Sequence, residues 1–292
     1  MKLSKHDRIG LATFMLPGLI LFLMFFILPV IYVLVVSLFK WDGMTRALFV
    51  GVENYLNIWK SAVFRRSVGN NLIWALAATC VQVPLAVLMA LILNERPRGW
   101  KVFRTIYYFP QVISGVALAM LWSAMYNSEY GLINGILKLL GRGDLAKNWL
   151  GTLQTALPAV LIYWVFYVGY YMVIVMSDLS GISKDYYEAA DIDGAGKIRQ
   201  AFYISLPLAK YSILTCVTLA AVMSLRQFEQ VFLLTNGGPA NRTSTMVLYL
   251  YKQIQDMRYG PANAASVMLI LVGVLVIISI RSLFRRWHTT YD

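Results

Sequence analysis

Long runs without a charged residue constrain this chain more than any other feature. Residues 11–39, 67–94, 105–128, 148–177 and 259–280 carry no Asp, Glu, Lys or Arg. Each run exceeds the roughly 20 residues that an α-helix needs to cross the hydrocarbon of a bilayer. A sixth run, 207–235, is long enough but contains Lys210, Arg226 and Glu229. We therefore expect an all-α polytopic membrane protein with six transmembrane helices.

The composition supports this class. Hydrophobic residues make up 59% of the chain and charged residues 14%, whereas soluble domains average about 45–50% and about 25%. Continuous apolar runs also differ from the alternating pattern of a transmembrane β-barrel. The net charge of +12 suggests nucleic-acid binding in a soluble protein, but these bases lie between apolar runs. There they anchor helices at lipid headgroups, so we expect a lipid bilayer and no nucleic acid as partner.

The distribution of basic residues predicts the orientation. Arg96, Arg98, Lys101 and Arg104 crowd one short connection between runs, and such clusters favour the cytoplasmic side. An even number of spans then places both termini in the cytoplasm. The first run is far longer than the 7–15-residue core of a signal peptide, and no small-residue cleavage site follows it. We therefore expect a retained helix.

Residues that carry enzyme chemistry are scarce. Cys80 and Cys216 lie inside apolar runs, and the two histidines, His6 and His288, lie near the ends of the sequence. No zinc spacing, disulfide framework or Ser-His-Asp set can be built from them. Gly196-Lys197 is not a phosphate-binding loop, because position 191 is Asp where that loop requires glycine. We expect neither a metal site nor ATPase activity in this chain.

The connection between the fourth and fifth runs predicts a helix-turn-helix. Ser183 is a good N-cap, and residues 186–192 can form two helical turns. Asp193-Gly194 is a break, since glycine tolerates the left-handed conformation that ends a helix. Residues 197–205 can form a second short helix, with Ile198, Ala201, Phe202 and Ser205 on one face. Pro207 suits the first turn of the next helix.

This connection resembles the EAA loop of ABC importer permeases, which couples the membrane helices to ATPase subunits. The family pattern runs Glu-Ala-Ala, Asp-Gly-Ala and Ile-x-Leu-Pro. The matching residues are Glu188, Ala189, Ala190, Asp193, Gly194, Ala195, Ile204, Leu206 and Pro207. An ordinary amphipathic connector is the alternative, since short motifs recur by chance.

A second motif agrees with the first. Residues 234–239 read Leu-Thr-Asn-Gly-Gly-Pro and resemble the turn after the fifth span of sugar permeases in this superfamily. The matching positions are Gly237, Gly238 and Pro239, and Thr243 follows them. Asn236 stands where the family usually has glycine, but asparagine tolerates the same turn conformations. Further stretches at 26–32, 54–55, 103–110 and 126–134 extend the resemblance over nearly the whole chain. The chain is thus similar to carbohydrate-uptake permeases, on the side of the larger maltose permease but without its large external domain.

The resemblance implies an architecture and partners. It implies the type I importer permease core in a bacterial cytoplasmic membrane. The expected parts are an N-terminal tail, first helix and external loop (1–66), a five-helix core (67–284) with its coupling loop (179–206), and a cytoplasmic tail (285–292). Implied partners are a second homologous permease subunit, two ATP-binding subunits and an extracytoplasmic solute-binding protein. No cofactor is expected in this chain, because ATP and Mg would be bound by the ATPase subunits.

A route for a sugar needs hydrogen-bonding groups and aromatic faces. In the fourth run Trp164, Tyr167 and Tyr171 have the i, i+3, i+7 spacing of one helical face. In the fifth, Gln227 and Glu229 are polar at membrane depth, where such groups usually face a cavity or a partner. Packing or an interfacial belt explains the aromatic residues equally well. Arg226 can pair with Glu229, and Asn70 and Asn71 can cap a helix.

Three other classes stay open on sequence alone. A secondary transporter or channel predicts an internal repeat or a selectivity ring, and no repeat is visible. An intramembrane enzyme needs paired acids or a Ser-His pair at membrane depth, where Glu229 is the one acid. The third class is a receptor or scaffold with no transport role, and the coupling-loop motif argues against it. The sequence does not name the sugar, and a phosphorylated polyol or an anionic oligosaccharide fits as well.

Overall fold

A computed structural model describes residues 5–288, and helices make up almost all of its regular structure. Within these residues the exception is one antiparallel pair of two-residue strands, β1 (Phe39–Lys40) and β2 (Leu48–Phe49). The basic residue Lys2 and positions 289–292 of the expected C-terminal tail lie outside the described residues. The chain divides into two compact units, Met1–Ser61 with Tyr249–Ile270, and Ala62–Leu248 with Leu271–Asp292.

The first unit joins a long apolar helix to a small polar hairpin. Its elements are α1 (Lys5–Phe22), the π-helix η1 (Leu23–Ile27), α2 (Leu28–Val36), β1, β2, α3 (Glu53–Lys60) and the adjoining parts of α16 (Met246–Gln255) and α17 (Tyr259–His288). The buried Asn54 amide donates to the carbonyls of Ser37 at 2.8 Å and Phe39 at 2.9 Å. A Cβ on Gly260 would meet the Phe39 oxygen at 2.1 Å, so the hairpin packs directly on the first turn of α17.

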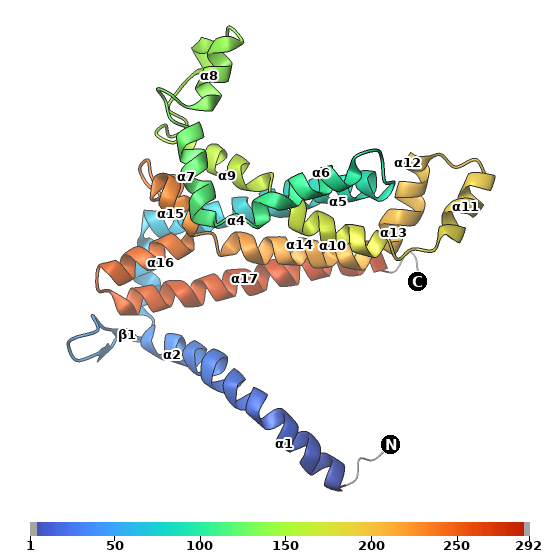
Figure 1. Cartoon of the computed structure of the whole chain (residues 1–292). Coiled ribbons are helices and arrows are strands. Elements are labelled where there is room, and N and C mark those ends of the chain that lie inside the picture. The colour runs from blue at the N-terminus through green and yellow to red at the C-terminus, as the bar shows by residue number, and fades with distance from the viewer. Residues whose placement is uncertain (1–4, 289–292) are drawn as a thin grey trace. The chain divides into compact units, whose positions relative to one another are not determined.

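The second unit is a helical bundle around α10. Its elements are α4 (Ala62–Ala77), η2 (Ala78–Gln82), α5 (Val83–Asn94), α6 (Trp100–Tyr108), η3 (Phe109–Gln111), α7 (Gly115–Met125), α8 (Leu132–Leu139), η4 (Gly143–Leu145), α9 (Ala156–Val165), α10 (Gly169–Leu179), α11 (Lys184–Ile192), α12 (Lys197–Gln200), η5 (Ala201–Ser205), α13 (Leu206–Leu208), α14 (Lys210–Leu225) and α15 (Glu229–Thr235). Figure 1 shows α5, α6 and α14 alongside α10, with α11 and α12 beyond one end of this group.

Four helices are long and apolar enough to cross a membrane, namely Thr13–Val36, Ala62–Asn94, Ala156–Leu179 and Tyr259–Phe284. They correspond to the first, second, fourth and last apolar runs. Two further candidates are bent pairs, Trp100–Gln111 with Gly115–Met125 at 98° and Lys197–Leu208 with Lys210–Leu225 at 72°. The described part of the chain thus contains four candidate spans, or up to six if each bent pair counts as one.

The expected boundaries differ from the structure where apolar runs are interrupted. The run 105–128 is not one straight helix, because the chain turns sharply at residues 112–114. The run 148–177 forms helix only from Ala156 and is interrupted at 166–168, while the run 207–235 is interrupted at 226–228. Pro207 lies within the helical segment 197–208, and the bend before α14 falls at Ala209. Apolar composition alone does not mark these interruptions.

Candidate functional site

The connection between α10 and α12 forms the helix and turn that its sequence predicts. Ser183 is the N-cap of α11, and its hydroxyl accepts from the Asp185 amide at 3.3 Å. Asp185 lies in the first turn, where a carboxylate favours the helix dipole. After Asp193, Gly194 takes the left-handed conformation with φ +73°. The second helix begins at Lys197 and continues through η5.

Two side-chain contacts tie the helices of this hairpin together. The Gln200 amide nitrogen donates to Asp191 Oδ1 at 2.6 Å and to the Ala195 carbonyl at 3.0 Å. The Tyr187 hydroxyl and Ser205 Oγ lie 2.9 Å apart. Gln200 and Ser205 are buried. The two helices are therefore linked by side-chain hydrogen bonds as well as by the turn between them.

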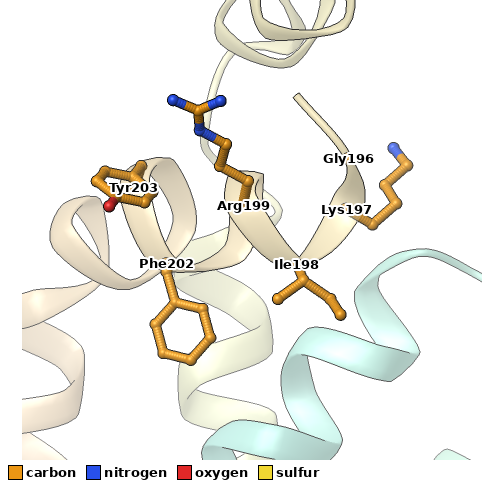
Figure 2. A pocket seen from close by; sticks show the side chains of 6 residues that line it. All are labelled: Gly196, Lys197, Ile198, Arg199, Phe202 and Tyr203. Carbon is orange, nitrogen blue, oxygen red and sulfur yellow. The ribbon is translucent and has the colours of Figure 1, made fainter. Parts of the chain in front are cut away.

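The outer surface of this hairpin is apolar and uncovered. Ile198, Phe202 and Tyr203 are 78%, 64% and 74% exposed. Together with Gly196, Lys197 and Arg199 they line an open surface hollow of about 990 Å³. Figure 2 shows Ile198 and Phe202 pointing to one side, with Arg199 beside Tyr203 on the other; the guanidinium lies 5.9 Å from that ring centre. An exposed apolar patch rimmed by polar groups is typical of an interaction surface.

The predicted coupling residues lie along this hairpin. Glu188, Ala189, Asp193 and Gly194 are exposed, and Ala190, Ala195, Leu206 and Pro207 are half-buried. None of them is fully enclosed, so a partner can reach them.

The interruption between α9 and α10 is held by glutamine side chains. The regular α-helical hydrogen bonds stop at residues 166–168, where the Tyr167 amide donates to the Trp164 carbonyl at 3.0 Å. The buried Gln82 amide adds bonds to the carbonyls of Trp164 at 3.2 Å and Tyr167 at 3.1 Å. The Gln111 amide also donates to the Tyr167 carbonyl, at 3.4 Å. Because an unsatisfied carbonyl is costly in a low-dielectric setting, these contacts make the interruption a stable feature.

Aromatic side chains gather around this interruption. Ring centroids lie 5.1 Å apart for Trp74–Trp164, 5.5 Å for Trp122–Tyr163 and 5.3 Å for Tyr163–Tyr167. The predicted common face of Trp164, Tyr167 and Tyr171 assumes an unbroken helix, and the chain breaks it between the first and last of them. Tyr167 joins the cluster and is half-buried, whereas the Tyr171 ring packs on Tyr170.

A second interruption presents Gln227 and Glu229 between α14 and α15. The Asn71 amide donates to the Leu225 carbonyl at 3.0 Å, and Asn71 Oδ1 accepts from the Met246 amide at 2.8 Å. Thr245 Oγ1 donates to the Gln227 carbonyl at 2.8 Å. Asn71 therefore links the end of α14 to the start of α16, in line with the capping alternative.

Glu229 begins α15 and lies against the start of α7. A Cβ added to Gly115 would meet Glu229 Oε2 at 2.6 Å. Within residues 5–288 no ion pair joins Arg226 to Glu229, so the expected pairing of these two side chains is not formed. Three chain interruptions, at 112–114, 166–168 and 226–228, thus accompany half-buried polar and aromatic groups within the expected spans.

The turn after α15 matches its motif. Asn236 takes the left-handed conformation with φ +47° and Gly237 has φ +85°. The fully buried Thr243 donates to the Gly238 carbonyl at 3.0 Å and lies 2.7 Å from Thr235 Oγ1. Asparagine therefore occupies the position where the family usually has glycine, as its conformational tolerance predicts.

Several structural side chains escape sequence reasoning. Gln82, Gln200 and Tyr187 contribute to the interruption at 166–168 and to the hairpin, yet the sequence analysis assigns none of them a role. The one available signal is a polar residue inside an apolar run, which applies to Gln82.

Similarity to known proteins identifies the family to which this chain belongs. Residues 82–289, well over half of the chain, match the family model described as "Binding-protein-dependent transport system inner membrane component". The chain belongs to this family. It is therefore a membrane-embedded permease component of a binding-protein-dependent ABC transport system.

Named relatives cover nearly the full chain. The trehalose/maltose transport system permease protein MalF of Thermococcus litoralis is 34% identical over 90% of this chain and 88% of its own length. The multiple sugar-binding transport system permease protein MsmF of Streptococcus mutans is 32% identical over 92% and 93%. A chain of the bacterial alginate ABC transporter, crystallised with an alginate pentasaccharide-bound periplasmic protein, aligns with a TM-score of 0.83 at 24% identity, covering 97% and 96%. This last likeness supports the fold.

Proposed function

We propose that the chain is the membrane-spanning subunit of an ATP-driven importer that moves a sugar or oligosaccharide by alternating access. The observation that carries this proposal is its family membership together with relatives named for trehalose, maltose and multiple sugars. The aromatic cluster beside Gln82 and Glu229 supports it, since sugar rings stack on aromatic faces and their hydroxyl groups need hydrogen-bond partners.

The proposed topology has six spans with both termini in the cytoplasm. Each of the two bent helix pairs then counts as one span, and the basic connection 95–104 faces the cytoplasm. The chain would comprise the first helix with its external loop (1–66), the core with its coupling loop (67–284) and a short tail (285–292), in a bacterial cytoplasmic membrane.

The hairpin of α11 and α12 is the proposed contact with the ATPase subunits. Its exposed apolar surface and the exposed Glu188 and Asp193 offer packing and hydrogen-bond acceptors to a partner. ATP and Mg would be bound by two partner chains, whose closure moves the hairpin and rocks the spans. A second permease subunit and an extracytoplasmic solute-binding protein would complete the assembly.

The proposed substrate route passes the interruptions at 166–168 and 226–228. Trp164, Tyr167, Tyr171, Gln227 and Glu229 would line it. The Glu229 carboxylate has no basic partner among the described side chains, and an unpaired carboxylate repels an anionic cargo. This favours a neutral sugar over a phosphorylated polyol or an anionic oligosaccharide.

Reconstitution with the partner subunits tests this function. ATPase activity of the complete complex should rise when the binding protein and its sugar are added, across a panel of neutral and anionic sugars. Uptake by this chain alone in liposomes, driven by an ion gradient without ATP, would contradict the proposal and favour a secondary transporter.

A further inference from the structure

Two adjoining cavities lie where α5, α6 and α10 meet. A recess of about 130 Å³ is lined by Arg96, Trp100, Arg104, Ser177 and Ser180, among others. A groove of about 520 Å³ is lined by Lys101, Thr105 and Tyr108. Trp100, Arg104 and Val173 line both, so the recess and the groove share a wall.

The recess concentrates positive charge without a counter-charge. The Arg96 guanidinium lies 5.8 Å and the Lys101 ammonium 6.0 Å from the centre of the same Trp100 ring. The nearby acid, Glu95, is paired with Lys197 at 3.3 Å. Over residues 5–288 no ion pair involves Arg96, Lys101 or Arg104. Like charges gathered in this way repel each other unless an anion lies between them.

The side chains of the recess suit a phosphate group. Guanidinium groups donate paired hydrogen bonds to phosphate oxygens. Ser177 adds a hydroxyl that makes no hydrogen bond to another described residue, whereas the Ser180 hydroxyl is engaged with the Met176 carbonyl at 2.8 Å. Arg96 has a left-handed backbone, with φ +51°, and its guanidinium lies over the Trp100 ring.

The groove next to the recess favours a phosphate that belongs to a lipid. α5 and α10 are apolar helices that end at Asn94 and Leu179, so their ends lie at headgroup depth. The helix α6 has no buried residue, and the groove beside it is lined by the apolar Val173 and by the rings of Trp100 and Tyr108. A soluble phosphate needs only the recess, whereas a phospholipid also needs an apolar surface for its chains.

We propose that this recess and groove bind an anionic phospholipid, with its phosphate between Arg96 and Arg104 and its acyl chains along α6. The proposal takes from the proposed function only the orientation, which places the site in the cytoplasmic leaflet.

Native mass spectrometry of the detergent-solubilised full chain tests the site. Phosphatidylglycerol or phosphatidylcholine is added, and bound lipid is counted for wild type, Arg96→Gln, Arg104→Gln and Ser177→Leu. Arg98→Gln is the matched control, because it removes one charge from the same exposed loop without lining either cavity. Ser177→Leu fills the recess without changing the charge. A parallel sample contains excess glycerol 3-phosphate.

We expect phosphatidylglycerol retention to fall about tenfold in Arg96→Gln and Arg104→Gln, since a charge-assisted bond is lost in each. Ser177→Leu should lose retention as well, and Arg98→Gln should keep it. Equal retention in all variants, or equal binding of phosphatidylcholine, would overturn the proposal. Displacement of the lipid by glycerol 3-phosphate would assign the recess to a soluble phosphate and overturn the lipid assignment. Lipid counting needs no transport, so failure here leaves the importer proposal untouched.

Discussion

The Gln200 amide nitrogen donates to Asp191 Oδ1 at 2.6 Å, which joins the second helix of the hairpin of α11 and α12 to the first. Nine residues separate the two positions, and Gln200 is buried. In the proposed mechanism the hairpin transmits force and must not flex at its own turn, and this contact ties its two helices together.

Replacing Gln200 with Leu should weaken the coupling of the hairpin to the ATPase subunits. The change removes a bond to a charged group, which contributes about 1.5–3 kcal/mol, and leaves the Ala195 carbonyl without its donor. We expect substrate-stimulated ATPase activity of the reconstituted complex to fall severalfold. Gln154→Leu, the same replacement at an exposed position, is the control. Wild-type stimulation in Gln200→Leu would remove this contact from the mechanism.

Substitutions at Gly194 should be graded by backbone strain rather than by size. A Cβ there meets nothing within 4 Å, but φ is +73°, a conformation that costs a residue with a side chain roughly 1–2 kcal/mol. Uptake rates should decrease in the order Asn, Ala, Val. Gly196→Ala should be nearly neutral, because Gly196 has φ −64° and open space. A Gly194→Val variant that transports at the wild-type rate would refute the coupling role of this turn.

Gln82→Leu should destabilise the interruption between α9 and α10. It removes the two hydrogen bonds from Gln82 to the Trp164 and Tyr167 carbonyls, each worth about 0.5–1.5 kcal/mol, while the Trp164 carbonyl keeps the Tyr167 N–H and the Tyr167 carbonyl keeps Gln111. The melting temperature of the solubilised chain should fall. Gln111→Leu should have a smaller effect, since its single bond is 3.4 Å long. Equal melting temperatures for Gln82→Leu and wild type would show that other groups stabilise the interruption between α9 and α10.

Alanine at Tyr167 and at Gln227 should weaken transport while leaving the complex assembled. Both residues lie at interruptions, where a passing sugar would find ring faces and polar groups. Sugar uptake kinetics provide the measurement, and co-purification of the partner subunits provides the assembly check. Phe166→Ala is the control, because Phe166 is 62% exposed beside Tyr167. Unchanged kinetics in both variants would exclude them from the route.

Acid should loosen the turn at Asp42. Its carboxylate accepts from the amides of Thr45 and Met44 and from the Thr45 hydroxyl, which lowers the pKa of Asp42 from its usual 3.8 to about 2. A lowered pKa means that the turn is stabilised above pH 4 and loses that support as the pH falls towards 2. Hydrogen exchange of the Met44 and Thr45 amides, corrected for intrinsic rates, should show this loss. Constant protection from pH 5 to pH 2 would contradict it.

Local rules predict the features that depend on neighbouring residues. The N-cap at Ser183, the left-handed Gly194 and the tolerance of Asn236 all follow from the chemistry of the residue itself. Four apolar runs also form long apolar helices, because length and composition decide that outcome.

Features that depend on residues far apart in the sequence cannot be predicted by the same local rules. Phe166, Tyr167 and Val168 contain no helix breaker, yet the helix stops there, and Gln82 and Gln111 donate to the carbonyls at the break. The start of α10 also approaches another backbone closely, since a Cβ on Gly169 would lie 2.2 Å from the Tyr107 carbonyl oxygen. Such contacts join positions more than 50 residues apart, which periodicity cannot reveal.

Cysteine cross-linking of the assembled transporter tests the central claim most directly. With Cys80 and Cys216 replaced by serine, a cysteine at Ile198 should cross-link to an ATP-hydrolysing subunit, and the yield should change when ATP is added. A cysteine at Leu139, 88% exposed at the end of α8, should not. Labelling of position 198 from the extracellular side, or no cross-link to a nucleotide-binding partner, would contradict the account.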